Sequence, residues 1–155
     1  TPNHEYAAPG DYVITLTVNG TMGFYGNSSS NDGGAILRYS SSVDNRNHIY
    51  QSSVQKIEIG NGATSIGTYA FYSCYSLASI TISDGATSIG SNTFYNCYCV
   101  AFYDFTAYTT VPKLVNTNAF AGIPVDCQIR VPASLVDAWK AATNWSRYAD
   151  HIVGV

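Results

Sequence analysis

The sequence is poor in charged residues. Asp, Glu, Lys and Arg make up 11% of its 155 residues, against roughly 25% in an ordinary globular domain. The seven Lys and Arg are scattered, so the chain has no basic stripe for nucleic-acid phosphates or an anionic membrane surface. No apolar run approaches the length of about 18 residues that a membrane-spanning helix needs. These shortages argue against a nucleic-acid partner and against a transmembrane segment.

Patterns that carry catalysis or metal binding are also missing. The three histidines fall at the ends and in a polar loop, and no serine lies in a nucleophile motif such as G-x-S-x-G. The ten acidic residues are dispersed, and the cysteines lack the C-x-x-C pairs of a zinc site. Residues 31–34 (NDGG) are a fragment of a calcium loop, better interpreted as a turn. We therefore expect no catalytic residue, no metal and no cofactor.

Aromatic and small polar residues take the place of charge. Thirteen tyrosines accompany six phenylalanines and two tryptophans, and Tyr is an amphipathic residue enriched in binding surfaces. Hydrophobic residues make up 46% of the chain, which argues against disorder. A surface of Ser, Thr, Asn, Gly and Tyr is common in extracellular β proteins, so the composition favours an extracellular or cell-surface location.

A repeat of 23 residues occupies the middle of the chain. Residues 57–77 (IEIGNGATSIGTYAFYSCYSL) and residues 80–100 (ITISDGATSIGSNTFYNCYCV) are identical at twelve of 21 positions. Each unit offers a short strand with alternate apolar residues, and one unit alone cannot bury them. Stacked units bury one continuous core in a parallel sheet, with neighbouring strands about 4.8 Å apart. The repeat therefore predicts a solenoid.

Two weaker turns follow the clear pair. A further shift of 23 places Tyr103 and Phe105 at the strand positions, and a turn longer by three residues places Ile129 and Val131 there. In the same alignment Val115 takes the place of Ile89. Gly62 and Gly85 suit the turn after the strand, where a positive φ is expected. The inward residues of adjacent parallel strands are predicted to be Ile57, Ile80, Tyr103 and Ile129.

The repeat resembles a known family. Residues 77–82 (LASITI) match the L-x-x-L-x-L core of leucine-rich repeats, and residues 66–77 fit the I-G-x-x-A-F-x-x-C-x-x-L run of the BspA-like variant. The third copy keeps Ala119-Phe120 but has Ile123 at the Cys position. The resemblance covers residues 54–155 and implies a mainly β solenoid with a parallel sheet, an irregular or loop-like returning side and a C-terminal capping helix. It also implies a bacterial surface protein, often an adhesin.

The C-terminal segment, residues 132–155, is expected to cap the repeats of residues 35–131. It resembles the closing segment of BspA-like proteins, and residues 132–143 have helical spacing. Ser134 followed by Asp137 predicts a capping box. The open end of a solenoid exposes core and strand edge, and we expect Trp139 and Trp145 to cover it.

The N-terminal segment, residues 1–34, is expected to form a β hairpin. Residues 12–18 alternate as a strand does, and residues 4–18 resemble the last hairpin of a PKD domain. Two interpretations stay open: a cap for the repeats, or the remnant of a PKD-like domain. The cap is favoured because an isolated hairpin is only marginally stable.

Two pairs of side chains share equivalent positions in the repeat. Cys74 and Cys97 do so, which predicts buried, reduced thiols that act as small hydrophobes. A disulfide between Cys99 and Cys127 is the weaker alternative, because their positions are not aligned. Tyr72 and Tyr95 are also equivalent, as are Tyr75 and Tyr98. These tyrosines form either a half-buried packing column or an aromatic contact ridge.

The outer face of the sheet is the first candidate site. Strand alternation directs Glu58, Thr81, Asp104 and Arg130 outward, with Phe102 as a lone aromatic beside them and Asp104 close enough to Arg130 for a cross-strand pair. Because a central aromatic is the usual anchor of an interface, we expect a ligand to contact Phe102, with the Tyr72/Tyr95 ridge as the alternative.

Two functions fit these features, and neither is enzymatic. The first is a cell-surface binding module, an adhesin for a host protein, a glycan or another cell. The second is a structural spacer or end domain of a longer surface protein, without a ligand of its own. An exposed cluster on the sheet face favours the first, and a uniformly polar face favours the second.

Overall fold

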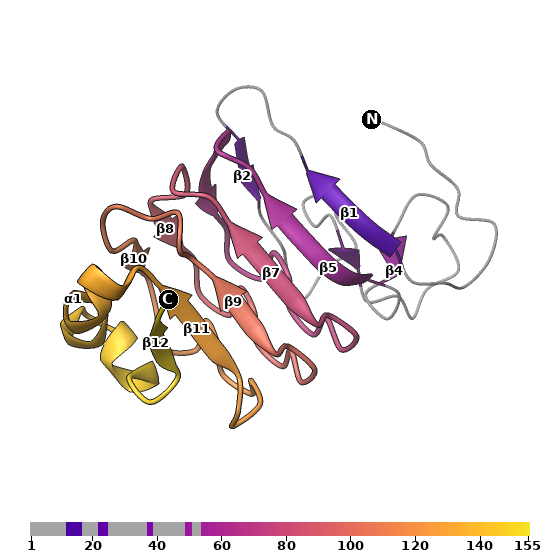
Figure 1. Cartoon of the computed structure of the whole chain (residues 1–155). Coiled ribbons are helices and arrows are strands. Elements are labelled where there is room, and N and C mark those ends of the chain that lie inside the picture. Colours follow the sequence, from indigo (N-terminus) through magenta and orange to yellow (C-terminus); the bar gives the residue numbers. More distant parts are fainter. Residues whose placement is uncertain (1–11, 17–21, 25–36, 39–48, 51–53) are drawn as a thin grey trace.

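The computed structural model describes residues 12–16, 22–24, 37–38, 49–50 and 54–155. A parallel sheet with the strand order β1-β5-β7-β9-β11-β12 runs through the molecule (Figure 1). From β5 to β11 the chain returns from the end of each strand to the start of the next, as a solenoid requires. The strands are β1 (Tyr12–Leu16), β5 (Val54–Ile59), β7 (Ser79–Ile82), β9 (Phe102–Asp104), β11 (Gln128–Val131) and β12 (Ile152–Gly154).

The returning side is more regular than the expected loop. It contains a second parallel sheet with the order β10-β8-β6-β2. Leu114 pairs with Ile89 there and is buried, whereas Val115 is 48% exposed, so the expected alignment of Val115 with Ile89 was wrong by one residue. The strands are β2 (Met22–Phe24), β6 (Ala63–Ile66), β8 (Ser88–Ile89) and β10 (Lys113–Leu114); β3 (Leu37–Arg38) and β4 (Ile49–Tyr50) pair in parallel separately.

The strand expected within residues 12–18 is observed as β1, and the rest of the expected N-terminal hairpin stays a prediction, because residues 1–11 and 17–21 lie outside the described residues. β1 pairs in parallel with β5, and β2 pairs in parallel with β6. The two strands therefore lie in different sheets and follow the path of one more solenoid turn. Alternation with a period of two signals a strand but does not specify the direction of its partner. The PKD-like stretch before residue 12 lies outside the described residues, and the proposed division at residues 34 and 131 stays a prediction.

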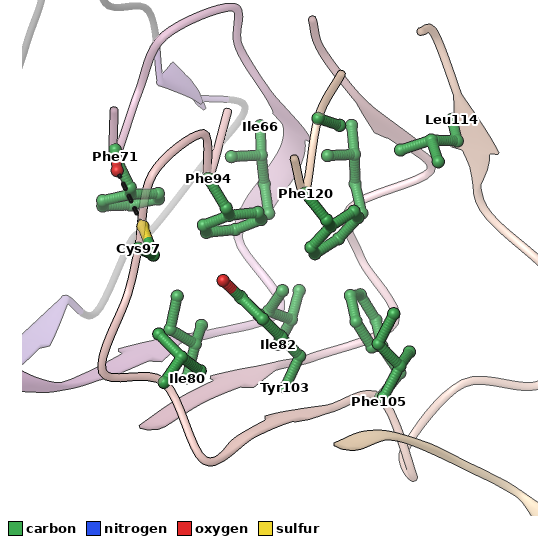
Figure 2. Close-up of a cluster of buried hydrophobic side chains, with 14 of the residues drawn as sticks. Ile66, Phe71, Ile80, Ile82, Phe94, Cys97, Tyr103, Phe105, Leu114 and Phe120 are labelled. Carbon is green, nitrogen blue, oxygen red and sulfur yellow. Dashed lines mark hydrogen bonds between the residues drawn. The ribbon is translucent and has the colours of Figure 1, made fainter. Parts of the chain in front are cut away.

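The core is built from columns of equivalent residues. Ile57 pairs with Ile80, Ile80 with Tyr103, and Tyr103 with Ile129, all in parallel register and all buried. The predicted column is therefore confirmed. Figure 2 shows strand residues such as Ile80 facing phenylalanine rings from the returning segments. These rings also stack from turn to turn, with centroids 5.5 Å apart for Phe71–Phe94 and 5.2 Å for Phe94–Phe120.

Backbone conformation repeats along with the side chains. Tyr69 and its equivalent Asn92 have φ of 59° and 52°, and Ser73 and its equivalent Asn96 have φ of 57° and 61°. The next turn has Gly122 with φ of 82° at the position of Asn96. Gly62 and Gly85 do not have positive φ, contrary to expectation. Gly85 is needed for close packing instead, since a Cβ there would lie 2.2 Å from the carbonyl oxygen of Asn61 in the preceding turn.

The thiols of Cys74 and Cys97 are buried and are not in disulfides, as predicted. Hydrogen bonding to the Cys97 side chain and burial raise the pKa of Cys74 well above its usual range. Cys97 donates its S–H to the carbonyl oxygen of Phe71 at 3.3 Å (Figure 2). Cys99 is exposed and Cys127 is buried, and both are free, so the alternative disulfide is not formed.

The C-terminal cap differs in detail from the expected helix. A 3₁₀ turn (Ala133–Leu135) precedes the helix α1 (Val136–Ala141), and a second 3₁₀ turn (Trp145–Tyr148) follows. Ser134 lies inside the first turn and makes no capping hydrogen bond, so the predicted capping box was wrong. Trp139 is buried, as expected, with its ring centroid 5.0 Å from that of Phe105 and 4.6 Å from that of Trp145. Within the described ranges, no helix is long and apolar enough to cross a membrane.

The two cap tryptophans provide a matched test of buried hydrogen bonding. Trp145 Nε1 donates to the carbonyl oxygen of Pro112 at 2.8 Å, whereas Trp139 Nε1 is buried without a partner among the described residues. Trp145→Phe leaves that carbonyl unpaired, so we expect it to lower the free energy of unfolding by about 1 kcal/mol more than Trp139→Phe. Urea denaturation of both variants measures the difference. Equal losses of unfolding free energy in the two variants would contradict the assigned roles. A third variant, Trp139→Ala, is expected to lower the free energy of unfolding by about 3–5 kcal/mol, and this loss measures how much the cap contributes.

Thiol reactivity tests the burial of the cysteines. Because the thiolate is the nucleophile, a buried thiol with a raised pKa reacts slowly, and burial followed by the charge of Asp126 raises the pKa of Cys127 to about 12. We expect iodoacetamide at neutral pH to label only Cys99 in the folded protein and all four cysteines in the unfolded protein. Peptide mass mapping distinguishes the four sites. Rapid labelling of Cys74 or Cys97 without unfolding would be incompatible with this core.

Candidate functional site

The outward side chains of the main sheet form two rows across its strands. Their register across β5, β7, β9 and β11 is the predicted one. In every strand these residues alternate with buried ones, so the rows face solvent. One row contains Lys56, Ser79, Phe102 and Gln128, and the other contains Glu58, Thr81, Asp104 and Arg130.

Arg130 lies on the ring of Phe102. The carbon at the centre of its guanidinium is 3.9 Å from the ring centroid, which is a close cation–π contact. Its Nε donates to Oε1 of Gln128 at 2.9 Å, and this bond holds the guanidinium in place. Phe102 itself is half-buried. An aromatic ring, a cation and an amide therefore form one ordered group at the boundary of β9 and β11, which we call the Phe102 platform.

The predicted ion pair between Asp104 and Arg130 is not formed. Although the two residues are directly paired across the strands, Oδ1 of Asp104 accepts from the backbone N–H of Thr106 at 2.9 Å and from its hydroxyl at 2.7 Å. An exposed ion pair would add less than about 1 kcal/mol. Asp104 therefore bonds to its local turn and Arg130 stacks on the ring of Phe102, and the two do not pair with each other.

The remaining part of the face is chemically different. On β5, Nζ of Lys56 lies 2.6 Å from Oε1 of Glu58, and both side chains are about two-fifths exposed. On β7, Ser79 and Thr81 are small and polar. Ser79 is the direct neighbour of Phe102 on the side away from Arg130, and its side chain is too small to cover the ring. The platform thus stays open on that side.

The position of Arg130 beside Phe102 was predicted from the sequence, but its stacking on the ring and its hydrogen bond with Gln128 were not. Phe102 is paired with Gln128, so Arg130 is the diagonal neighbour of Phe102. Long side chains and aromatic rings commonly reach across such diagonals. The register therefore indicated that Arg130 could reach Phe102, but the prediction paired Arg130 with Asp104, the residue directly opposite.

The tyrosines lie elsewhere, in the loops that precede β7 and β9. Tyr72 stacks on Tyr95 with centroids 5.3 Å apart and planes at 5°, and Tyr75 stacks on Tyr98 at 5.7 Å and 11°. Tyr72 and Tyr95 are half-buried, while Tyr75 and Tyr98 are 40% and 53% exposed. We call these four residues the tyrosine columns. They do not join the Phe102 platform in one site.

An open groove of about 370 Å³ separates β10 from the C-terminal cap. Its polar backbone is already engaged: Asn144 Nδ2 donates to the carbonyl oxygen of Leu114 at 2.8 Å, as Trp145 does to that of Pro112. Nδ1 of His151 likewise lies 2.9 Å from the carbonyl oxygen of Cys127. Among the residues with described positions, no group of three His, Cys, Asp or Glu could hold a metal ion. His4 and His48 lie outside the described residues.

The comparisons with known proteins identify the repeat. Residues 42–135 match a family model described as a BspA type leucine rich repeat region with six copies. The search of curated proteins gives no match. Repeats of this type typically mediate binding and are typical of bacterial surface proteins. The match spans more than half of the chain and includes the stacked strands from β5 to β11, so the chain belongs to the BspA-type leucine-rich repeat family.

Proposed function

We propose that this chain is a cell-surface binding module of the adhesin type, and that it contacts a protein ligand through the Phe102 platform. The observation that carries the proposal is the guanidinium of Arg130 lying 3.9 Å from the centroid of Phe102 on the outer face of the sheet. Aromatic and Arg side chains are the residues most enriched among binding hot spots.

The platform is ordered before any ligand arrives. Gln128 holds Nε of Arg130, and the ring of Phe102 supports the guanidinium. Immobilising a rotamer-rich side chain on binding costs about 0.5–1.5 kcal/mol, and this cost is reduced when the side chain is already held. The arrangement therefore favours recognition more than an unsupported Arg would.

The chemistry of the platform indicates the kind of ligand it fits. Arg presents its N–H donors in a planar fork that matches a carboxylate. The side of the Phe102 ring next to Ser79 offers apolar contact. A protein segment with a carboxylate beside an apolar side chain satisfies both groups. The low charge of the chain and its family are consistent with a position at the bacterial surface.

Binding assays with defined ligands test this proposal. The chain is applied to arrays of purified host matrix proteins and glycans, and the affinity for a protein that binds is measured for variants. We expect Phe102→Ala to weaken binding by about tenfold or more, as for an aromatic anchor. Arg130→Lys, which keeps the charge and loses the planar fork, should weaken binding nearly as much as Arg130→Gln.

Lys140→Gln on the cap is the matched control, because it removes the same charge from an exposed position away from the sheet face. It should bind as the wild type does. Urea denaturation of each variant establishes that the fold is retained. A folded Phe102→Ala variant with full affinity would place the site elsewhere, and failure of the wild type to bind any array component would favour the spacer function.

A further inference from the structure

The loops that contain the tyrosine columns lie in a part of the chain without charge. Residues 59–83 and 85–103 contain no Asp, Glu, Lys, Arg or His. Figure 1 shows the loops leading into β7 and β9 lying side by side at the same end of the strands. The side chains available there are phenols, hydroxyls, amides and one exposed thiol. The side chains of these two loops therefore offer no ion-pairing partner for a charged peptide, a nucleic acid or a sulfated glycan.

Each tyrosine column spans two adjacent turns. The rings of Tyr75 and Tyr98 are nearly parallel with centroids 5.7 Å apart, which is an offset contact that covers only part of one face of each ring. The two residues are 40% and 53% exposed, so part of each phenol group is accessible to a ligand. A phenol hydroxyl group both accepts and donates hydrogen bonds.

The stack of rings ends at the next turn. Ser73 N–H donates to the carbonyl of Tyr95 and Asn96 N–H donates to the carbonyl of Ala121, both at 2.8 Å. Ala121 is therefore the equivalent of Tyr95 one turn later, and its side chain is only a methyl group. The face of Tyr95 toward that turn is consequently not covered by another ring. An apolar ring face beside hydroxyl and amide groups is suited to the C–H face of a sugar.

We propose that the tyrosine columns bind an uncharged β-linked glycan, with its sugar rings against the open face of Tyr95 and the exposed parts of Tyr75 and Tyr98. The absence of charged residues from the two loops favours a neutral ligand, and the phenol groups match a polymer rich in hydroxyl groups. The proposal uses other residues than the Phe102 platform and does not depend on the function proposed there.

Depletion of the intact chain from solution by microcrystalline cellulose, a neutral β-linked glucan, tests the proposal. Binding should persist in 1 M NaCl, where the screening length falls to about 3 Å. We expect the Tyr75→Ala/Tyr98→Ala variant and the Tyr95→Ala variant each to bind at least about tenfold more weakly, as aromatic anchors do. Lys140→Gln, at an exposed position on the cap, is the control and should bind cellulose as the wild type does.

The outcomes separate the alternatives. Urea denaturation verifies that each variant is folded, and Tyr75→Phe/Tyr98→Phe, which keeps the stack and removes the hydroxyl groups, is expected to bind more weakly than the wild type and better than the alanine variant. No depletion of the wild type, loss of binding in 1 M NaCl, or equal depletion of wild type and the folded alanine variant would each overturn the proposal. Failure here would leave the Phe102 platform untouched, because its assay uses a protein ligand and different residues.

Discussion

Every part of this structure depends on the hydrogen bonds that join one turn to the next in fixed register. At the start of the main strands, Ala78 N–H donates to the carbonyl of Gln55, Ala101 to Ala78, and Gln128 to Ala101, at 2.7–2.9 Å. Each turn is thereby placed directly against its neighbour. Side chains at equivalent positions must then pack on one another, which explains why the rings of Phe71, Phe94 and Phe120 form one stack.

This constraint determines what the sequence alone could predict. The column of Ile57, Ile80 and Tyr103 followed from a period of 23, because register and sequence repeat are the same quantity in a solenoid. Where the period changes, the prediction was less accurate, because the extra three residues of the third turn can be placed at several points. Val115 was therefore predicted to take the position of Ile89, although Leu114 is the buried residue there. The N-terminal strand β1 followed from alternation, but alternation does not identify the partner of a strand, and the parallel pairing of β1 with β5 was not predicted.

The same reasoning explains the partial success at the site. Register placed Phe102, Asp104 and Arg130 on one face, but it could not choose between a direct and a diagonal neighbour for a side chain as long as Arg.

The environment of Tyr103, a core residue, was also harder to predict from the sequence. Tyr103 replaces Ile in its column and buries its hydroxyl group completely. Burial, and then the thiols around it, of which Cys97 is the first, raise the pKa of Tyr103 well above its usual range, so the phenol stays neutral.

Stacking in register also gives the two candidate surfaces different characters. Along the sheet face the residue type changes at every turn, from Lys56 to Ser79, Phe102 and Gln128. Such a row has one distinctive point and suits a ligand with a matching, non-repeating surface, as a folded protein has. In the loops the residue type is preserved, Tyr72 with Tyr95 and Tyr75 with Tyr98. Each preserved pair places the same side chain on two adjacent turns, so a ligand there would meet the same contact twice. The same backbone register thus produces two surfaces of different character on one short solenoid.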